Sequence, residues 1–160
     1  RLGAGLAAPG EDVWTIGARR AMRDEGAFSW RNATMAELGG AAAGALIAYG
    51  VGDAPEPLDD LPALARPLQE LENLAPGSRY VNVIAVYPAF RGRGVARRLM
   101  AEAEAAAVGA AEMSLIVADR NAAAMGLYRA LGYRERARRA IVAEGWPTES
   151  TEWVLMVKPL

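Results

Sequence analysis

A glycine- and arginine-rich turn carries the residues best suited to chemistry in this chain. Residues 91–96 read Arg91-Gly92-Arg93-Gly94-Val95-Ala96, between an apolar run at 81–86 and an alanine-rich helical run at 97–107. A turn with so little side-chain bulk leaves successive backbone N–H groups unpaired, and the helix behind it adds the positive end of its dipole. The arginines supply full positive charges beside these groups. The segment therefore predicts a binding site for a phosphate-bearing ligand.

The composition excludes several other kinds of site. The 160 residues include no cysteine and no histidine. Disulfides, thiolate catalysis, Ser-His triads and metal sites built on cysteine or histidine are therefore excluded, and we expect no metal. Any general acid or base must be a carboxylate, a tyrosine, Lys158, an amine terminus or water.

Length and charge limit the number of domains and the partners. The chain has the length of one domain, 1–160, and its 52% hydrophobic and 23% charged residues are typical of a soluble globular protein. The net charge of −1 gives no basic field for nucleic acid or anionic lipid. No apolar run approaches the roughly 20 residues of a membrane span. We expect a cytoplasmic protein without a nucleic-acid or membrane partner.

The elements that must position the turn follow from periodicity and turn residues. We expect strands at 27–34, 41–50, 80–86, 113–118, 133–143 and 151–157, with a hairpin turn at 37–40. We expect helices from Asp12 to about Glu25, in broken pieces over 58–74, and at 93–108 and 121–131. This order predicts an α/β (α+β) fold with a mixed sheet flanked by helices.

The glycine turn has other interpretations. It could be a tight connection and nothing else. A P-loop is excluded, because Gly94 is followed by Val95-Ala96 and not by Lys-Ser/Thr. A Rossmann fingerprint needs a third glycine where Arg97 stands, although Asp119 could supply its acidic residue. A Rossmann-like nucleotide binder therefore remains an alternative.

Two motifs in this part of the chain resemble those of a known family. The turn matches the pattern Q/R-x-x-G-x-G/A, which is similar to the acetyl-CoA signature of the GNAT superfamily of N-acetyltransferases. Downstream, residues 121–133 resemble the second motif of that family, N-x(3)-A-x-x-L-Y-x-x-x-G-F/Y. The resemblance covers residues 80–133 and implies a mostly antiparallel, twisted sheet that splays at the cofactor site. The family's usual first strand is either absent from this chain or irregular.

The resemblance implies acetyl-CoA as cofactor, with CoA as product, and it implies where the cofactor binds. Its pyrophosphate is expected on the turn, formed by Arg91, Gly92, Arg93, Gly94, Val95, Ala96 and Arg97. The pantetheine arm is expected to pair with the backbone of Ile84, Ala85 and Val86, as an added strand would. The Val86 N–H would then stabilise the oxyanion.

The resemblance also gives roles to two residues of the second motif. Asn121 and Tyr128 are two helical turns apart and share a face. Asn121 is expected to cap its helix, to contact CoA, or both. Tyr128 either packs in the core or protonates the departing CoA thiolate, and the resemblance favours the second role.

The general base is where the sequence departs from the family. The strand before the second motif has no carboxylate, and the strand before the turn offers only Asn82. Glu70, Glu72 or Asp119 could accept the amine proton, and we name Glu72 as the candidate base. Each of the three could instead be a solvated surface residue, which would leave water or backbone as the route.

The expected acceptor is an amine on a small molecule or a peptide. Candidate walls of its site are Phe28, Trp30, Glu70 and Trp146. An acyl-CoA-binding or regulatory module without turnover is the alternative function. Pairing through the last strands would give a homodimer.

Overall fold

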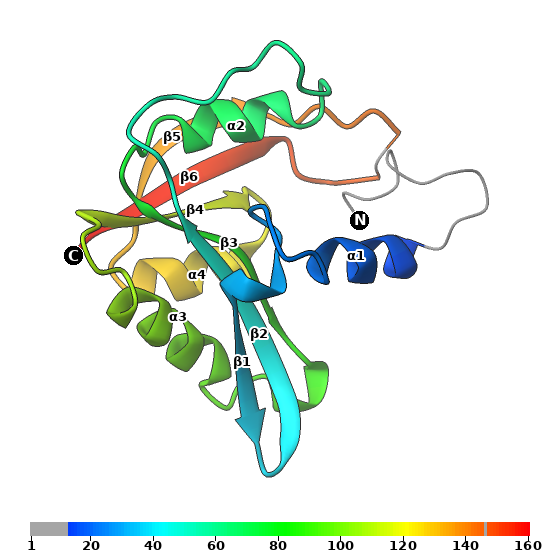
Figure 1. Cartoon of the computed structure of the whole chain (residues 1–160), viewed down its shortest axis with the longest axis vertical. Coiled ribbons are helices and arrows are strands. Elements are labelled where there is room, and N and C mark those ends of the chain that lie inside the picture. Colours follow the sequence, from blue (N-terminus) through cyan, green and yellow to red (C-terminus); the bar gives the residue numbers. More distant parts are fainter. Residues whose placement is uncertain (1–12, 146) are drawn as a thin grey trace.

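The fold is built on one mixed β-sheet whose strands lie between residues 33 and 159. The computed structural model describes residues 13–145 and 147–160. Its six strands lie in the order β1-β2-β3-β4-β6-β5 (Figure 1). In chain order their bounds are Ala33–Leu38, Ala41–Gly50, Arg79–Val86, Glu112–Ala118, Arg134–Ala140 and Glu152–Pro159. Among these strands only β3 and β4 pair in parallel. The predicted mixed, mostly antiparallel sheet is confirmed, and it does not fit a parallel Rossmann sheet.

Helices cover both faces of the sheet. Helices α3 (Val95–Ala105) and α4 (Ala122–Ala130) cover one face, and α2 (Arg66–Glu72) covers the other. Side chains of the central strand β4 alternate between them. Met113, Leu115 and Val117 pack with the helices α3 and α4, whereas Ile116 packs with Leu71 of α2. Because β3 is the neighbour of β4 in the sheet, an opening between these two strands would join the side covered by α3 and α4 to the side covered by α2.

The start of the sheet differs from the prediction. The strand expected at 27–34 is a turn followed by the short 3₁₀ helix η2 (Trp30–Asn32). Ser29 causes this, because its hydroxyl accepts from Arg31 N at 3.2 Å and donates to Arg23 O at 2.7 Å. Strand β1 begins at Ala33 instead, and only Gly39 and Gly40, both at positive φ, remain in the hairpin turn.

The helices are shorter than the sequence predicts. The first, α1 (Val13–Ala21), ends before Glu25, and its predicted cap Asp12 lies outside the described residues. Over 58–74 only α2 is α-helical, and it begins with a proline in its first turn. Helix α3 starts at Val95 because the residue before it, Gly94, has φ 79°. The helix therefore begins directly at the glycine turn.

The sheet splays between β3 and β4, as the sequence predicts. The two strands pair only from Arg79 opposite Met113 to Val81 opposite Leu115, and beyond this they diverge (Figure 1). A β-bulge lies at the point of divergence. In the pairing with β2, Val81 lies opposite Ala48 and Val83 opposite Ile47, so Asn82 is the extra residue. A bulge bends its strand and increases the local twist, which turns the end of β3 away from β4.

Candidate active site

The glycine turn forms an open cradle at the start of α3. It follows the short 3₁₀ helix η3 (Pro88–Phe90), and Gly92 and Gly94 have φ of 74° and 79°. A Cβ built on either glycine would meet no atom within 4 Å, so the space in front of the turn is open. No side chain caps the first turn of α3. Its leading N–H groups are therefore available to an anionic ligand.

A pocket of about 280 Å³ lies at this turn. Leu127 of α4 and Phe90 of η3 complete a wall that is otherwise made of predicted cofactor-binding residues, namely Val86, Arg91, Gly92, Gly94, Val95, Ala96 and Arg97. The guanidinium of Arg93 lies 5.8 Å from the Phe90 ring centroid. The structure thus brings the end of β3, the turn and the start of α3 together around one pocket.

The end of β3 presents backbone groups to the splay. Tyr87 N donates to Ala43 O of the hairpin strand β2 at 3.0 Å. Because N–H directions alternate along a strand, the N–H groups of Val86 and Ile84 point to the opposite edge, toward the splay, whereas that of Ala85 points toward β2. Arg91 Nε donates to Val86 O at 3.2 Å, which ties the turn to this edge. An extended ligand could pair with β3 here.

Tyr128 lies on α4 with its side chain 6% exposed. Its ring packs against Tyr133 with 6.0 Å between centroids. Burial raises the pKa of its hydroxyl. Burial is the main cause that raises the pKa of Tyr80 on β3, and the charges of Glu72 and Tyr128 add to it. Tyr128 is therefore a core residue whose hydroxyl is protonated at neutral pH.

Asn121 is the N-cap of α4. Its Oδ1 accepts from Ala124 N at 3.2 Å, which confirms the capping role that its position predicts. The residue is exposed. It does not line the pocket at the glycine turn.

The structure separates the three candidate bases. Glu70 of α2 accepts from Arg139 Nε of β5 at 2.6 Å. Asp119 accepts from Thr151 N and Oγ1 at 3.1 and 3.0 Å. Desolvation is the largest single influence and raises the pKa of Asp119, but the hydrogen bonds from Thr151, Glu152 and Ser150 together outweigh it, so the net pKa is lowered. Both carboxylates thus already have hydrogen-bond donors as partners.

Glu72 differs from the other two carboxylates. It forms none of the ion pairs found among the described residues. Burial raises its pKa, and hydrogen bonds from Tyr49 and Gln69 oppose this only in part. Tyr49 OH donates to Glu72 Oε2 at 2.9 Å. The sequence did not reveal this tyrosine, because its partner lies 23 residues away on another element.

The predicted acceptor residues are only partly brought together. Phe28 and Trp30 are neighbours at η2, where Phe28 is half-buried under the Arg20 guanidinium and Trp30 is 52% exposed. Trp30 Nε1 donates to Asp24 Oδ1 at 3.3 Å. Glu70 faces Arg139 instead, and Trp146 lies outside the described residues.

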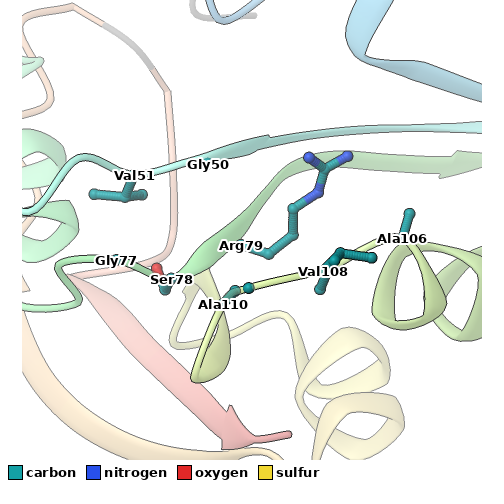
Figure 2. Close-up of a pocket in the computed structure, with 10 residues that line it drawn as sticks. Gly50, Val51, Gly77, Ser78, Arg79, Ala106, Val108 and Ala110 are labelled. Carbon is teal, nitrogen blue, oxygen red and sulfur yellow. The ribbon is translucent and has the colours of Figure 1, made fainter.

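A second pocket, of about 230 Å³, lies at the other end of β3. Figure 2 shows Arg79 extending from β3 beside Ala106 and Val108, which follow α3. The Arg79 Nε is buried and has no hydrogen-bond partner among the described residues. The seven-residue separation of Arg79 from Val86 along the strand is about 23 Å. This pocket contains none of the predicted site residues.

Solved structures share this fold. An N-acetyltransferase from Staphylococcus aureus Mu50 superposes with a TM-score of 0.64 at 16% identity, covering 96% of this chain and 84% of that one. The ribosomal-protein-S18-alanine N-acetyltransferase from Escherichia coli superposes with a TM-score of 0.59 at 21% identity, covering 93% of this chain and 77% of that one. A Bacillus subtilis acetyltransferase in complex with CoA superposes with a TM-score of 0.60 at 16% identity, covering 97% of this chain and 87% of that one. At these identities the likeness shows the fold.

The family follows from the sequence match. The model of the acetyltransferase (GNAT) family matches residues 7–133, which include the glycine turn, the splayed strands and α4. The chain therefore belongs to the GNAT acetyltransferase family. No curated protein sequence gives a significant match. No helix in the part of the chain that the structure describes is long and apolar enough to cross a membrane.

Proposed function

We propose that this protein is an acetyl-CoA-dependent N-acetyltransferase in which an amine attacks the thioester directly. One observation carries the proposal. The open glycine turn, the end of β3 at Val86 and Leu127 of α4, the neighbour of Tyr128, line one pocket beyond the point where β3 leaves β4. Membership of the family and the CoA complex of a structural neighbour support it.

The chain's own groups fit this cofactor. The turn from Arg91 to Arg97 would hold the pyrophosphate, because it offers open N–H groups, a helix N-terminus and guanidinium charges. The pantetheine arm would pair with the backbone of Ile84 and Val86, whose N–H groups point to the splay, whereas Ala85 between them pairs with β2. Asn121 would contact CoA from the start of α4. When bound, acetyl-CoA supplies an activated acetyl group.

Each catalytic role is assigned to one group of the chain. The Val86 N–H points to the splayed edge and would donate to the carbonyl oxygen as negative charge develops there. The Tyr128 hydroxyl stays protonated at neutral pH, since burial raises its pKa, and would give its proton to the leaving sulfur. Glu72, which forms none of the ion pairs found among the described residues and whose pKa burial raises, would take the proton of the amine.

The acid and the base lie on opposite faces of the sheet. Tyr128 belongs to the layer of α3 and α4, and Glu72 belongs to α2. The acceptor would therefore approach from the α2 face while the thiol leaves toward α4. A small molecule or a peptide amine fits this arrangement, and Phe28 and Trp30 are the candidate walls.

Thiol release from acetyl-CoA tests the proposal. We expect release with at least one amine of a panel that contains spermidine, Nα-acetyl-lysine and a peptide with a free N-terminus. Glu72→Gln should lower kcat/KM by about a hundredfold or more, whereas Glu70→Gln and Asp119→Asn should not. Tight CoA binding without release for any amine would favour a regulatory acyl-CoA-binding module instead.

A further inference from the structure

We propose that Tyr49 relays the proton of the acceptor amine to Glu72, and that Asn82 holds the tyrosine hydroxyl beside the splay. This inference rests on the proposed function, in which Glu72 is the base. It assigns a role to two residues that lie outside both sequence motifs.

A continuous hydrogen-bonded chain joins the carboxylate to the bulge. Tyr49 OH donates to Glu72 Oε2 at 2.9 Å, and Asn82 Nδ2 donates to Tyr49 OH at 3.5 Å. Asn82 is the inserted residue at which β3 leaves β4. The tyrosine hydroxyl is therefore the polar group between the carboxylate on α2 and the point where the sheet opens.

The sheet fixes the position of this tyrosine. Tyr49 on β2 lies opposite Tyr80 on β3, and the ring centroids are 5.4 Å apart with planes tilted by 60°. The Tyr80 ring thus supports the Tyr49 ring, and the hydroxyl of Tyr49 is the one that is bonded to Glu72.

The charges around Glu72 suit a proton acceptor. The groups that act on it are Tyr49 from β2, Tyr80 from β3, Gln69 from α2 and Glu56 from the preceding loop. None of these is a cation. Since no ion pair in the described part of the chain neutralises the Glu72 carboxylate, uptake of a proton relieves the cost of burying its charge.

The relay is a balanced transfer. An N–H bond of the protonated amine, the ammonium form, breaks as a new O–H bond forms on Tyr49. The original O–H bond of Tyr49 breaks at the same time, and its proton passes to Glu72 Oε2. Tyr49 remains neutral throughout, which agrees with burial and the nearby Glu72 raising its pKa well above the ordinary value. The amine ends as a neutral nucleophile and Glu72 as a carboxylic acid.

The variant Tyr49→Phe tests the relay, because it keeps the ring and removes the hydroxyl. With acetyl-CoA and the amine of the panel that reacts best, we expect kcat/KM to fall about 10- to 100-fold. The hydrogen bond from Tyr49 favours the charged carboxylate, so its loss should raise the pKa of Glu72. The acidic limb of the pH profile should therefore move to higher pH by about half a pH unit. Tyr80→Phe is the matched control: it removes a neighbouring buried hydroxyl that is not bonded to Glu72, and both measures should stay close to wild type.

A second readout does not need turnover. In protein labelled with ¹³C at glutamate side chains and without ligand, the carboxyl titration of Glu72 should shift upward in Tyr49→Phe and hardly in Tyr80→Phe. The double variant Tyr49→Phe/Glu72→Gln should be no slower than Glu72→Gln alone. The relay would be overturned if a folded Tyr49→Phe protein kept the wild-type pH profile and the carboxyl titration of Glu72 did not shift. If wild-type protein binds CoA but acetylates no amine, the proposed function fails, and the titration still decides whether Tyr49 is coupled to Glu72.

Discussion

At the scale of single residues, the site depends on a few groups whose environments differ sharply. Glu70 and Glu72 lie on the same short helix, yet Arg139 pairs with the first while the second faces tyrosines. Asp119 keeps a lowered pKa through Thr151. Spacing alone cannot separate three carboxylates in this way, because their partners come from β5, β2 and the segment before β6.

The hydroxyl of Tyr128 can be tested alone. We expect Tyr128→Phe to lower kcat about a hundredfold with little change in the KM for acetyl-CoA, because the ring still fills its place in the core. Since an acid must be protonated and burial raises the pKa above 10, wild-type activity should not decline between pH 7 and 9. Steady-state kinetics over this range provide the measurement. Unchanged kcat in the variant would show that the thiolate leaves without help from Tyr128.

The turn glycines can be tested by one added methyl group. Gly94→Ala places a Cβ at φ 79° into the open space of the cradle, and we expect CoA affinity to fall tenfold or more, which is about 1.4 kcal/mol. Gly109→Ala is the control, because Gly109 has φ 83° with equally open space after α3. Both should lose about 1–2 kcal/mol of stability. Calorimetric titration with CoA separates the two effects, and equal affinities would contradict a pyrophosphate site at the turn.

At the scale of elements, the sequence predicts what local patterns determine. The apolar run that becomes β3, the glycines at both ends of α3 and the capped start of α4 were all predicted close to their positions. The strand expected at 27–34 was wrong because the Ser29 hydroxyl competes with strand pairing. The bond between Tyr49 and Glu72 needed β2 and α2 in their final places, so no local pattern could indicate it.

The bulge in β3 determines whether the sheet opens. Deleting Asn82 would bring Val81 and Val83 into the regular register with β2 and remove the bend. We expect β3 and β4 to pair further along their length and CoA affinity to fall at least tenfold. Calorimetry measures the affinity, and hydrogen exchange of the amides at 84–86 reports the new pairing. A folded deletion variant with wild-type CoA affinity would show that the splay does not depend on the bulge.

At the scale of the whole molecule, the two ends of β3 have different properties. At one end the sheet is paired on both sides of the strand, and the pocket there is lined by Arg79 and small residues after α3 (Figure 2). At the other end β3 has lost β4 as a neighbour and ends at the glycine turn. A ligand that occupies the splay supplies the missing neighbour, so it should stabilise one end of the molecule more than the other.

CoA should therefore protect the protein locally as well as raise its melting temperature. At a concentration of 100 times Kd, ligand binding adds about 2.7 kcal/mol, which corresponds to an increase in Tm of about 5–10 °C for a chain of this length. Hydrogen exchange should slow at Ile84, Val86 and the turn from Gly92 to Arg97, where the ligand would cover backbone N–H groups. Exchange should change much less at Arg79, about 23 Å from Val86 along the strand, and at Gly109, which lines the same pocket as Arg79. Protection at the Arg79 end with none at the turn would place the cofactor in the pocket at Arg79 and contradict a site at the turn. A shift in Tm with NAD but not with CoA would instead indicate a Rossmann-like nucleotide binder.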